Sequence, residues 1–210
     1  MNYYQDITLL PDADIALGFL WQKIYQQVHI ALVEQKVDVQ HSAIAVSFPG
    51  YGSKGFPLGN KLRVLAKEKT QLEKLNLAGF LTRFEDYTHL KSIQPVPEDT
   101  VPVAFVRQQV KGQARIAKDM QAKAQLWSEK SGQSLEACLQ QLEKTKPKGE
   151  SKAPFIWMQS QQTKASNPEH SARFPLFIQK VVAEQAHDGM FNCYGLSVAR
   201  DEEVATVPHF

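Results

Sequence analysis

The sequence has few of the features that mark disulfide-rich, zinc-binding or membrane proteins. It contains only two cysteines, Cys138 and Cys193, which form no CxxC pair. This argues against a disulfide framework and a cysteine-rich zinc site, fits a reducing compartment, and leads us to expect a cytoplasmic protein. No apolar run of about 18 residues occurs, so no membrane span is expected. The first fourteen residues carry three aspartates, and they lack the positively charged start followed by an apolar run that marks a secretory signal. No secretory signal is therefore expected.

Motifs that bind metals or nucleotides are also missing. There is no HExxH and no regular spacing of Asp, Glu and His, and the acidic clusters are short. The glycine-rich stretch GYGSKGFPLG lacks the spacing of a phosphate-binding or dinucleotide-binding fingerprint, so we interpret it as a loop. We therefore predict neither a metal nor another cofactor.

The net charge of +2 is small, but the charges are unevenly distributed. Residues 1–105 carry ten Lys or Arg against eleven Asp or Glu, residues 106–152 carry ten against five, and residues 153–210 carry four against six. The positive excess therefore lies in the middle of the chain, as expected for an element that follows a phosphate backbone. A solvated helix face is the other explanation of the same charges.

The hydrophobic pattern predicts an α+β fold with an N-terminal ferredoxin-like domain at residues 1–105. Strand patterns occur at residues 2–10, 43–48, 61–66 and 88–94, and helical patterns at residues 15–34 and 70–84. Asp12 or Asp14 is expected to cap the first helix, and Thr70 with Glu73 to form a capping box on the second. The order strand, helix, strand, strand, helix, strand is that of ferredoxin-like or RNA-recognition-type domains.

Residues 106–210 are predicted to form a β-rich half that carries one basic helix. The polar helix is expected at about 113–143, with a break near Gly132. Strands are expected at residues 103–110, 155–158, 174–180 and 190–194. A fold of this kind does not by itself indicate a function.

RNA can be cleaved without a metal, because the 2′-hydroxyl beside the scissile phosphate is itself a nucleophile. The protein then supplies a base, groups that orient the hydroxyl, and donors to the phosphoryl oxygens. Histidine suits the role of base because its ordinary pKa is about 6.5. The chain has six histidines: His29, His41, His89, His170, His187 and His209. Composition and spacing do not choose among them, although His29, one position after Val28, lies at the edge of the apolar helix face, where an imidazole is partly buried and still reaches a ligand.

Short segments over nearly the whole chain resemble one known family. In order, they are YYQDITLLPD, VHIALVEQ, AVSFPGY, LGNKLRVLA, PFIWMQSQ, RFPLFI, CYGLS and VPHF. Their order and spacing resemble the type I-F CRISPR repeat-processing endoribonucleases, the hairpin-binding Csy-type subunits. The resemblance implies metal-independent cleavage of CRISPR repeat RNA at the base of a hairpin, with a 2′,3′-cyclic phosphate as product. It also implies that the protein stays on the mature crRNA hairpin, together with the other subunits of a type I-F surveillance complex.

The resemblance assigns roles to four residues. The proposed general base falls on His29, a serine that holds the attacking nucleotide falls on Ser160, and the tyrosine that places the histidine falls on Tyr194. The aromatic residue that stacks on the terminal base pair of the hairpin falls on Phe174. Taken without the resemblance, Ser160 is a strand hydroxyl, Tyr194 a half-buried sheet residue and Phe174 a core aromatic.

The predicted polar helix resembles the arginine-rich helix with which the family enters the major groove of the hairpin. Lys111 and Gln113 match the residues that read base edges, since Lys donates to guanine and Gln pairs with adenine. The basic residues predicted to bind RNA along the helix are Arg115, Lys118 and Lys123. This helix has fewer arginines than its counterpart in the family, so it is expected to displace fewer counterions and to bind more weakly or with less salt dependence.

The chain also departs from the family after Ser160. The family's short hairpin is lengthened here to QQTKASNPEHSA, and Gln162 stands where the family has a second serine. The alternative function is a subunit that binds the RNA hairpin without cleaving it. The presence of His29 and Ser160 at the matching positions favours the enzyme.

Overall fold

The computed structural model describes residues 1–110, 112–145, 151–160, 173–200 and 203–210. Its contacts divide the chain into two compact units, Met1–Gln108 with Pro154–Phe210, and Gln109–Ala153. The predicted domain boundary after residue 105 stays a prediction, because a compact group of contacts is not by itself a domain that folds independently.

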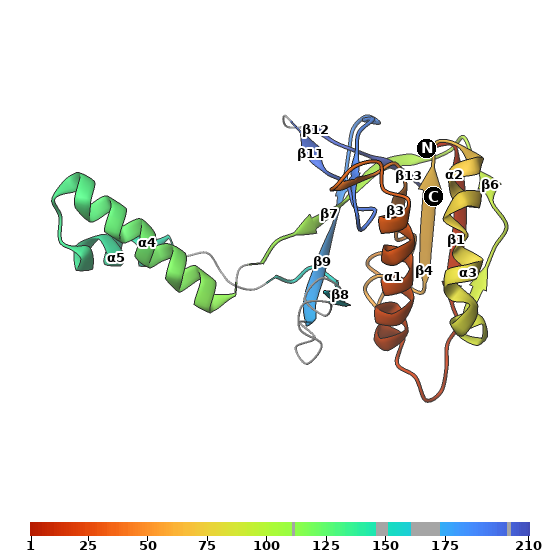
Figure 1. Ribbon diagram of the computed structural model, residues 1–210, viewed down its shortest axis with the longest axis horizontal. Coiled ribbons are helices and arrows are strands. Elements are labelled where there is room, and N and C mark those ends of the chain that lie inside the picture. The colour runs from red at the N-terminus through yellow and green to blue at the C-terminus, as the bar shows by residue number, and fades with distance from the viewer. Residues whose placement is uncertain (111, 146–150, 161–172, 201–202) are drawn as a thin grey trace. The chain divides into compact units, whose positions relative to one another are not determined.

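The N-terminal part of the first unit contains an antiparallel sheet in the order β3-β4-β1-β5 (Figure 1). Its strands are β1 (Tyr3–Leu9), β3 (Ala45–Ser47), β4 (Lys61–Ala66) and β5 (Thr88–Leu90), and β6 (Gln94–Pro95) pairs with the start of β1. The first and third of the four main strands lie side by side in the centre, and the second and fourth lie at the edges. This confirms the predicted ferredoxin-like order in an α+β fold.

The strand predicted over residues 88–94 is wrong in its length. β5 ends at Leu90, and Gln94 belongs to the separate strand β6. Both strands pair with β1, and the amide of Lys91 donates to the carbonyl of Asp6 at 2.9 Å between them. The chain therefore leaves the ladder briefly and returns to it, which an alternating pattern does not reveal.

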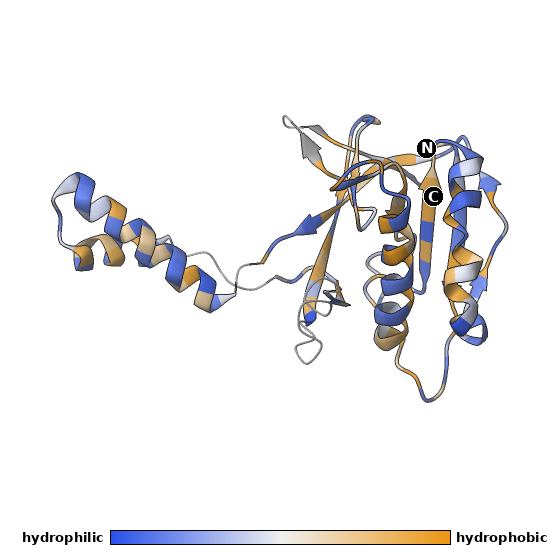
Figure 2. Ribbon diagram, viewed as in Figure 1, coloured by the Kyte–Doolittle hydropathy of each residue, from blue (hydrophilic) through white to orange (hydrophobic). Residues whose placement is uncertain are grey.

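One long helix and three short helical segments accompany this sheet. They are α1 (Leu17–Glu34), α2 (Lys69–Leu75), α3 (Leu77–Leu81) and the 3₁₀ segment η1 (Thr82–Tyr87). α1 buries Leu20, Ile24 and Val28 because residues four apart share one face of a helix, and Figure 2 shows hydrophobic and hydrophilic residues on the same helix. The buried indole N–H of Trp21 donates to the carbonyl of Gly59 at 2.8 Å. Neither α1 nor any other described helix is long and apolar enough to cross a membrane.

The predicted cap of α1 is wrong. The residue before the helix is Ala16, and no side chain caps the first turn. The Asp12 carboxylate instead accepts hydrogen bonds from the amides of Asp14 and Ile15, both at 2.9 Å. It therefore closes a turn that precedes the helix, because α1 begins too far along the chain for Asp12 or Asp14 to act as its cap.

The predicted helix over residues 70–84 also starts and ends differently. Its capping box is formed by Glu68 and Gln71 rather than Thr70 and Glu73, because the first helical residue is already Lys69. Asn76 adopts a left-handed conformation with φ +48°. A left-handed residue ends an α-helix, so α2 ends at this residue and α3 begins after it. The segment then continues as the 3₁₀ segment η1.

The C-terminal part of the first unit forms a second sheet in the order β13-β7-β9-β8. Its strands are β7 (Val101–Gln108), β8 (Phe155–Gln159), β9 (Arg173–Val182) and β13 (Val207–His209). One face joins the core that includes α1, and its buried residues are Val103, Phe105, Ile156, Met158, Leu176, Ile178 and Val207. Two short ladders complete the unit, β2 (His41–Ser42) with β10 (Phe191–Asn192) and β11 (Ala199–Arg200) with β12 (Glu203–Val204). The strand predicted at residues 190–194 is thus shorter than expected, and a turn follows it.

The second unit is a helical hairpin of α4 (Gln113–Ser131) and α5 (Leu135–Lys144). Gly132 has φ +68°, which only glycine adopts readily, and the predicted break near this residue is confirmed. Ser134 caps α5 by accepting from the amide of Ala137 at 3.3 Å. A small core of Ala124, Cys138 and Leu142 holds the two helices together.

Candidate active site

A pocket of about 470 Å³ in the first unit collects side chains from four segments of the chain. α1 contributes His29, β9 contributes Phe174, Ser160 directly follows β8, and Tyr194 lies just after β10. The other lining residues are Ile30, Val33, Glu34, Lys36, Val39, Gln159 and Cys193. The structure therefore brings together the three residues predicted for catalysis and the predicted stacking aromatic, while their roles stay predictions.

The His29 imidazole is held in one tautomer by the backbone. Its Nδ1 lies 2.8 Å from the carbonyl oxygen of Cys193. A carbonyl only accepts, so Nδ1 carries the proton and Nε2 keeps its lone pair. Among the described residues none bonds to Nε2. This arrangement presents a base to the pocket.

The turn that contains Tyr194 fixes the ring lying against His29. The two ring centres are 4.3 Å apart and the planes differ by 12°. The Tyr25 hydroxyl donates to the Tyr194 carbonyl at 2.8 Å, and the Tyr194 amide donates to the Asn192 side chain at 2.9 Å. Gly195 follows with φ +73°, and a Cβ there would lie 2.7 Å from Val46 Cγ1. The turn thus requires glycine and has little freedom to move the tyrosine ring.

Burial sets the charge of His29 in the protein without RNA. Desolvation lowers the pKa of the imidazole below its ordinary value, and the hydrogen bond to Cys193 opposes this more weakly. A position near the C-terminal end of a helix such as α1 favours the charged form of a histidine. Burial is the stronger effect, so His29 is neutral at pH 7, the form that a general base requires.

Arg107 is a residue of this region that the sequence did not single out. Its guanidinium carbon lies 5.5 Å from the centre of the Phe174 ring and 5.4 Å from that of Tyr194. The two rings meet nearly edge to face, with centres 6.5 Å apart. Burial raises the pKa of the Tyr194 hydroxyl, and the charge of Arg107 opposes that rise. In the sequence, Arg107 is marked only as a cation directly after the apolar run VAFV. Such a cation does not indicate a site unless the strand register is known.

The end of β8 is tied to α1 immediately before Ser160. The amide of Gln159 donates to Gln26 Oε1 at 3.1 Å. Gln26 precedes His29 by three residues, so both lie on the same side of α1. This bond fixes the backbone that leads to Ser160 beside the helix carrying the base. Gln162, which stands where the resembled family has a second serine, lies outside the described residues.

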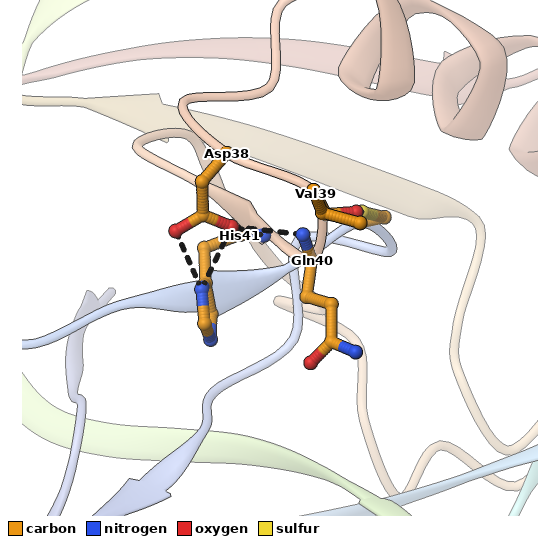
Figure 3. A network of polar contacts seen from close by, with 5 residues as sticks. Asp38, Val39, Gln40 and His41 are labelled. Carbon is orange, nitrogen blue, oxygen red and sulfur yellow. Dashed lines mark hydrogen bonds and ion pairs between the residues drawn. The ribbon is translucent and has the colours of Figure 1, made fainter.

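Of the other described histidines, none lines this pocket. The most notable is His41, whose Nδ1 lies 2.9 and 3.0 Å from the two carboxylate oxygens of Asp38. Figure 3 shows this pair together with Gln40, whose amide also donates to Asp38. The network stabilises the loop after α1, which contains the pocket residue Val39. His170 lies outside the described residues.

The residues predicted to bind RNA through a basic helix lie on the second unit. Gln113, Arg115, Lys118 and Lys123 are all exposed on α4. The Lys123 ammonium lies 5.1 Å from the centre of the Trp127 ring. α4 begins at Gln113 after Gly112, and Lys111 lies outside the described residues. The pocket itself is lined by residues of the first unit.

Potential metal ligands are not gathered in the part of the chain that the structure describes. No group of three or more His, Cys, Asp or Glu side chains there is placed to hold an ion. Cys138 and Cys193 are both free, one buried and the other half-buried.

Comparison with known proteins finds similarity over nearly the whole chain. Residues 4–210 match the family model described as CRISPR-associated protein (Cas_Csy4). A protein of Pseudomonas aeruginosa (strain UCBPP-PA14), named CRISPR-associated endonuclease Cas6/Csy4, is 28% identical over 202 residues. The alignment covers 94% of this chain and 96% of that protein.

Proposed function

Because the chain belongs to the Cas_Csy4 family of CRISPR-associated proteins, we propose that it is an endoribonuclease that cuts CRISPR repeat RNA at the base of a hairpin. The observation that carries the proposal is the hydrogen bond from His29 Nδ1 to the Cys193 carbonyl, which leaves Nε2 as the basic nitrogen. The pocket around it falls within the size range of sites for small ligands, about 300–1,000 Å³. The name of the P. aeruginosa relative supports cleavage rather than binding alone.

The proposed reaction is an internal transfer of the phosphoryl group. His29 Nε2 removes the proton of the 2′-hydroxyl, and the oxygen attacks the adjacent phosphorus in line with the bond that breaks. The new P–O bond closes a 2′,3′-cyclic phosphate. The 5′-oxygen of the next nucleotide leaves and takes a proton from solvent to become a hydroxyl, and the protonated His29 returns its proton to solvent. The transfer therefore consumes no water and is proposed to need no metal ion or other cofactor.

The neighbours of His29 position the reacting groups. Tyr194 holds the plane of the imidazole by ring contact. The Ser160 hydroxyl holds the ribose that attacks, and Phe174 stacks on the terminal base pair, an interaction of about 1–3 kcal/mol per base. Arg107, a cation beside both rings, is suited to attract a phosphate of the same RNA.

The helix α4 provides the proposed contacts with the stem. Lys111 and Gln113 read base edges in the major groove, and the cations that follow on α4 neutralise phosphates. Binding over so many contacts makes release of the product slow. We expect each protein molecule to cut a single RNA. It then remains on the crRNA hairpin beside other subunits of a type I-F surveillance complex.

Cleavage of repeat RNA in EDTA tests the proposal. The wild type should give a cyclic-phosphate product, and an RNA with a single 2′-deoxy nucleotide before the scissile phosphate should stay intact. His29→Ala should abolish cleavage and keep hairpin binding. The matched control is His89→Ala, since His89 is exposed on β5 and lies outside the pocket.

Each outcome of this experiment has a separate meaning. Cleavage that persists unchanged in His29→Ala removes the imidazole from the mechanism. A wild type that binds the hairpin but never cleaves it supports the alternative of a non-catalytic hairpin-binding subunit. Cleavage of the 2′-deoxy RNA excludes attack by the 2′-oxygen.

A further inference from the structure

The outer face of β8 and β9 carries three aromatic side chains that the proposed reaction does not use. Alternation along the strands places Phe155 and Trp157 of β8 and Phe177 of β9 on one side of the sheet. Phe155 and Phe177 are partners in the ladder, and their ring centres lie 5.3 Å apart. The rings of Phe155 and Trp157 meet edge to face at 5.5 Å. These three residues are called the aromatic face.

The aromatic face is open to solvent, whereas the opposite side of the same strands belongs to the core. Trp157 is 45% exposed and Phe155 is 40% exposed, while the intervening Ile156 and Met158 are 2% and 0% exposed. β8 is also at the edge of its sheet, pairing only with β9 among the described strands. Proteins normally avoid exposed apolar edges, because such edges invite aggregation. An exposed aromatic cluster on such an edge strand indicates a surface that a ligand covers during function.

The charges of the sheet favour a polyanion as that ligand. The strands β7, β8 and β9 contain no Asp or Glu. Of their cations, Arg107 and Lys180 lie on the core side, because the ladder places them opposite Ile178 and Phe105. Arg173 has the same parity as Phe177 in β9, so it stands on the side of the aromatic face, opposite Gln159 in the ladder. Exposed rings beside a cation suit unpaired nucleic acid, because bases stack on the rings and the cation attracts a phosphate. Bases inside a stem are already stacked on one another and offer no free face.

The aromatic face is also close to the candidate active site. Ser160 lies three residues after Trp157, which is about 10 Å along an extended chain at ~3.3 Å per residue. Phe174 precedes Pro175, the ladder partner of Trp157. Figure 1 shows β8 and β9 side by side, and Figure 2 shows the middle of β9 as hydrophobic. RNA held in the pocket can therefore reach the aromatic face with an unpaired segment of a few nucleotides.

We propose that the aromatic face is a stacking platform for unpaired RNA that flanks the hairpin. Trp157 and Phe155 each take a base, and Arg173 attracts the adjoining phosphate. The inference rests on the proposed function, because it assumes that a repeat hairpin occupies the neighbouring pocket. It extends the substrate from a hairpin alone to a hairpin with single-stranded RNA attached.

The test compares two RNAs, the hairpin with its unpaired flanks and the hairpin alone. The protein carries His29→Ala so that the RNA stays uncut. Trp157→Ala and Phe155→Ala should each weaken binding of the flanked RNA about fivefold to 150-fold, which corresponds to ~1–3 kcal/mol per stacked base. Binding of the hairpin alone should not change. Trp157→Phe should retain most of the affinity, because it keeps an aromatic ring.

The matched control is Val182→Ala, which removes a 67% exposed apolar side chain from β9 outside the aromatic face. It should leave binding of both RNAs unchanged, and thermal unfolding should be similar for all variants, because none of these side chains is buried.

Three results overturn the inference. If wild type and alanine variants bind the flanked RNA with equal affinity, no base stacks on the aromatic face. If the same variants also lose co-purifying CRISPR-associated proteins, the aromatic face binds a protein partner. Equal weakening for both RNAs shows that the variants disturb the hairpin site instead. If the hairpin alone does not bind even to the parent protein, the proposed function fails, and this outcome is distinct from the other two.

Discussion

Removing the Tyr194 ring tests how the pocket prepares the base. The ring lies parallel to the His29 imidazole at 4.3 Å between centres, so it both orients the imidazole and shields it from water. Tyr194→Phe keeps the ring and removes only the hydroxyl, whereas Tyr194→Ala removes both. We expect the phenylalanine variant to cleave at nearly the wild-type rate and the alanine variant to be slower.

Two effects of Tyr194→Ala combine in the cleavage rate. Loss of an aromatic contact of this kind costs about 0.5–1.5 kcal/mol, and since ~1.4 kcal/mol is tenfold, the rate at alkaline pH should fall about twofold to tenfold. The pKa of His29 is lowered by burial, so exposing the imidazole raises this pKa toward its ordinary value of about 6.5. A base acts in its deprotonated form, and the midpoint of the rising pH–rate curve therefore moves to higher pH. The loss of rate is greatest on the acidic side.

The assay is cleavage with protein in excess over RNA, measured from acidic to alkaline pH for both variants. Subsaturating protein reports the pKa of the free enzyme, and saturating protein that of the complex, where RNA phosphates raise it. An equal loss of rate in Tyr194→Phe and Tyr194→Ala would assign the role to the hydroxyl. A rate loss with an unchanged midpoint would refute the argument that burial sets the pKa of His29.

Three further predictions concern other parts of the chain. Phe174→Ala should weaken hairpin binding by about 1–3 kcal/mol with the fold intact; unfolding at room temperature would show that the ring is structural. Lys118→Ala should flatten the slope of log affinity against log salt by about one, and an unchanged slope would place this lysine off the RNA. Arg63→Met should lower the free energy of unfolding by about 3–5 kcal/mol in denaturant titrations, because Asp6 is left buried without its 2.7 Å partner. A loss below about 1 kcal/mol would show that the more distant Lys61 compensates.

Local patterns were sufficient for much of the fold. The buried face of α1 follows from apolar residues such as Leu20, Ile24 and Val28, and the break between α4 and α5 follows from Gly132. The helix starts were predicted less well. A cap must stand directly before the first helical turn, so a difference of one or two residues in the start of a helix replaces Thr70 by Glu68 as the capping residue. That difference is set by packing, which periodicity does not describe.

The candidate site depends on contacts that no local pattern contains. His29 and Cys193 are 164 positions apart, and their hydrogen bond selects the tautomer of the base. The same C-terminal turn supplies the Tyr194 ring that covers the imidazole. The C-terminal end of a helix favours a charged histidine, whereas burial in the folded protein lowers the pKa of His29 and favours the neutral form. The single tautomer and the lowered pKa both arise when the C-terminal turn packs on α1, so the prepared base is a property of the folded first unit.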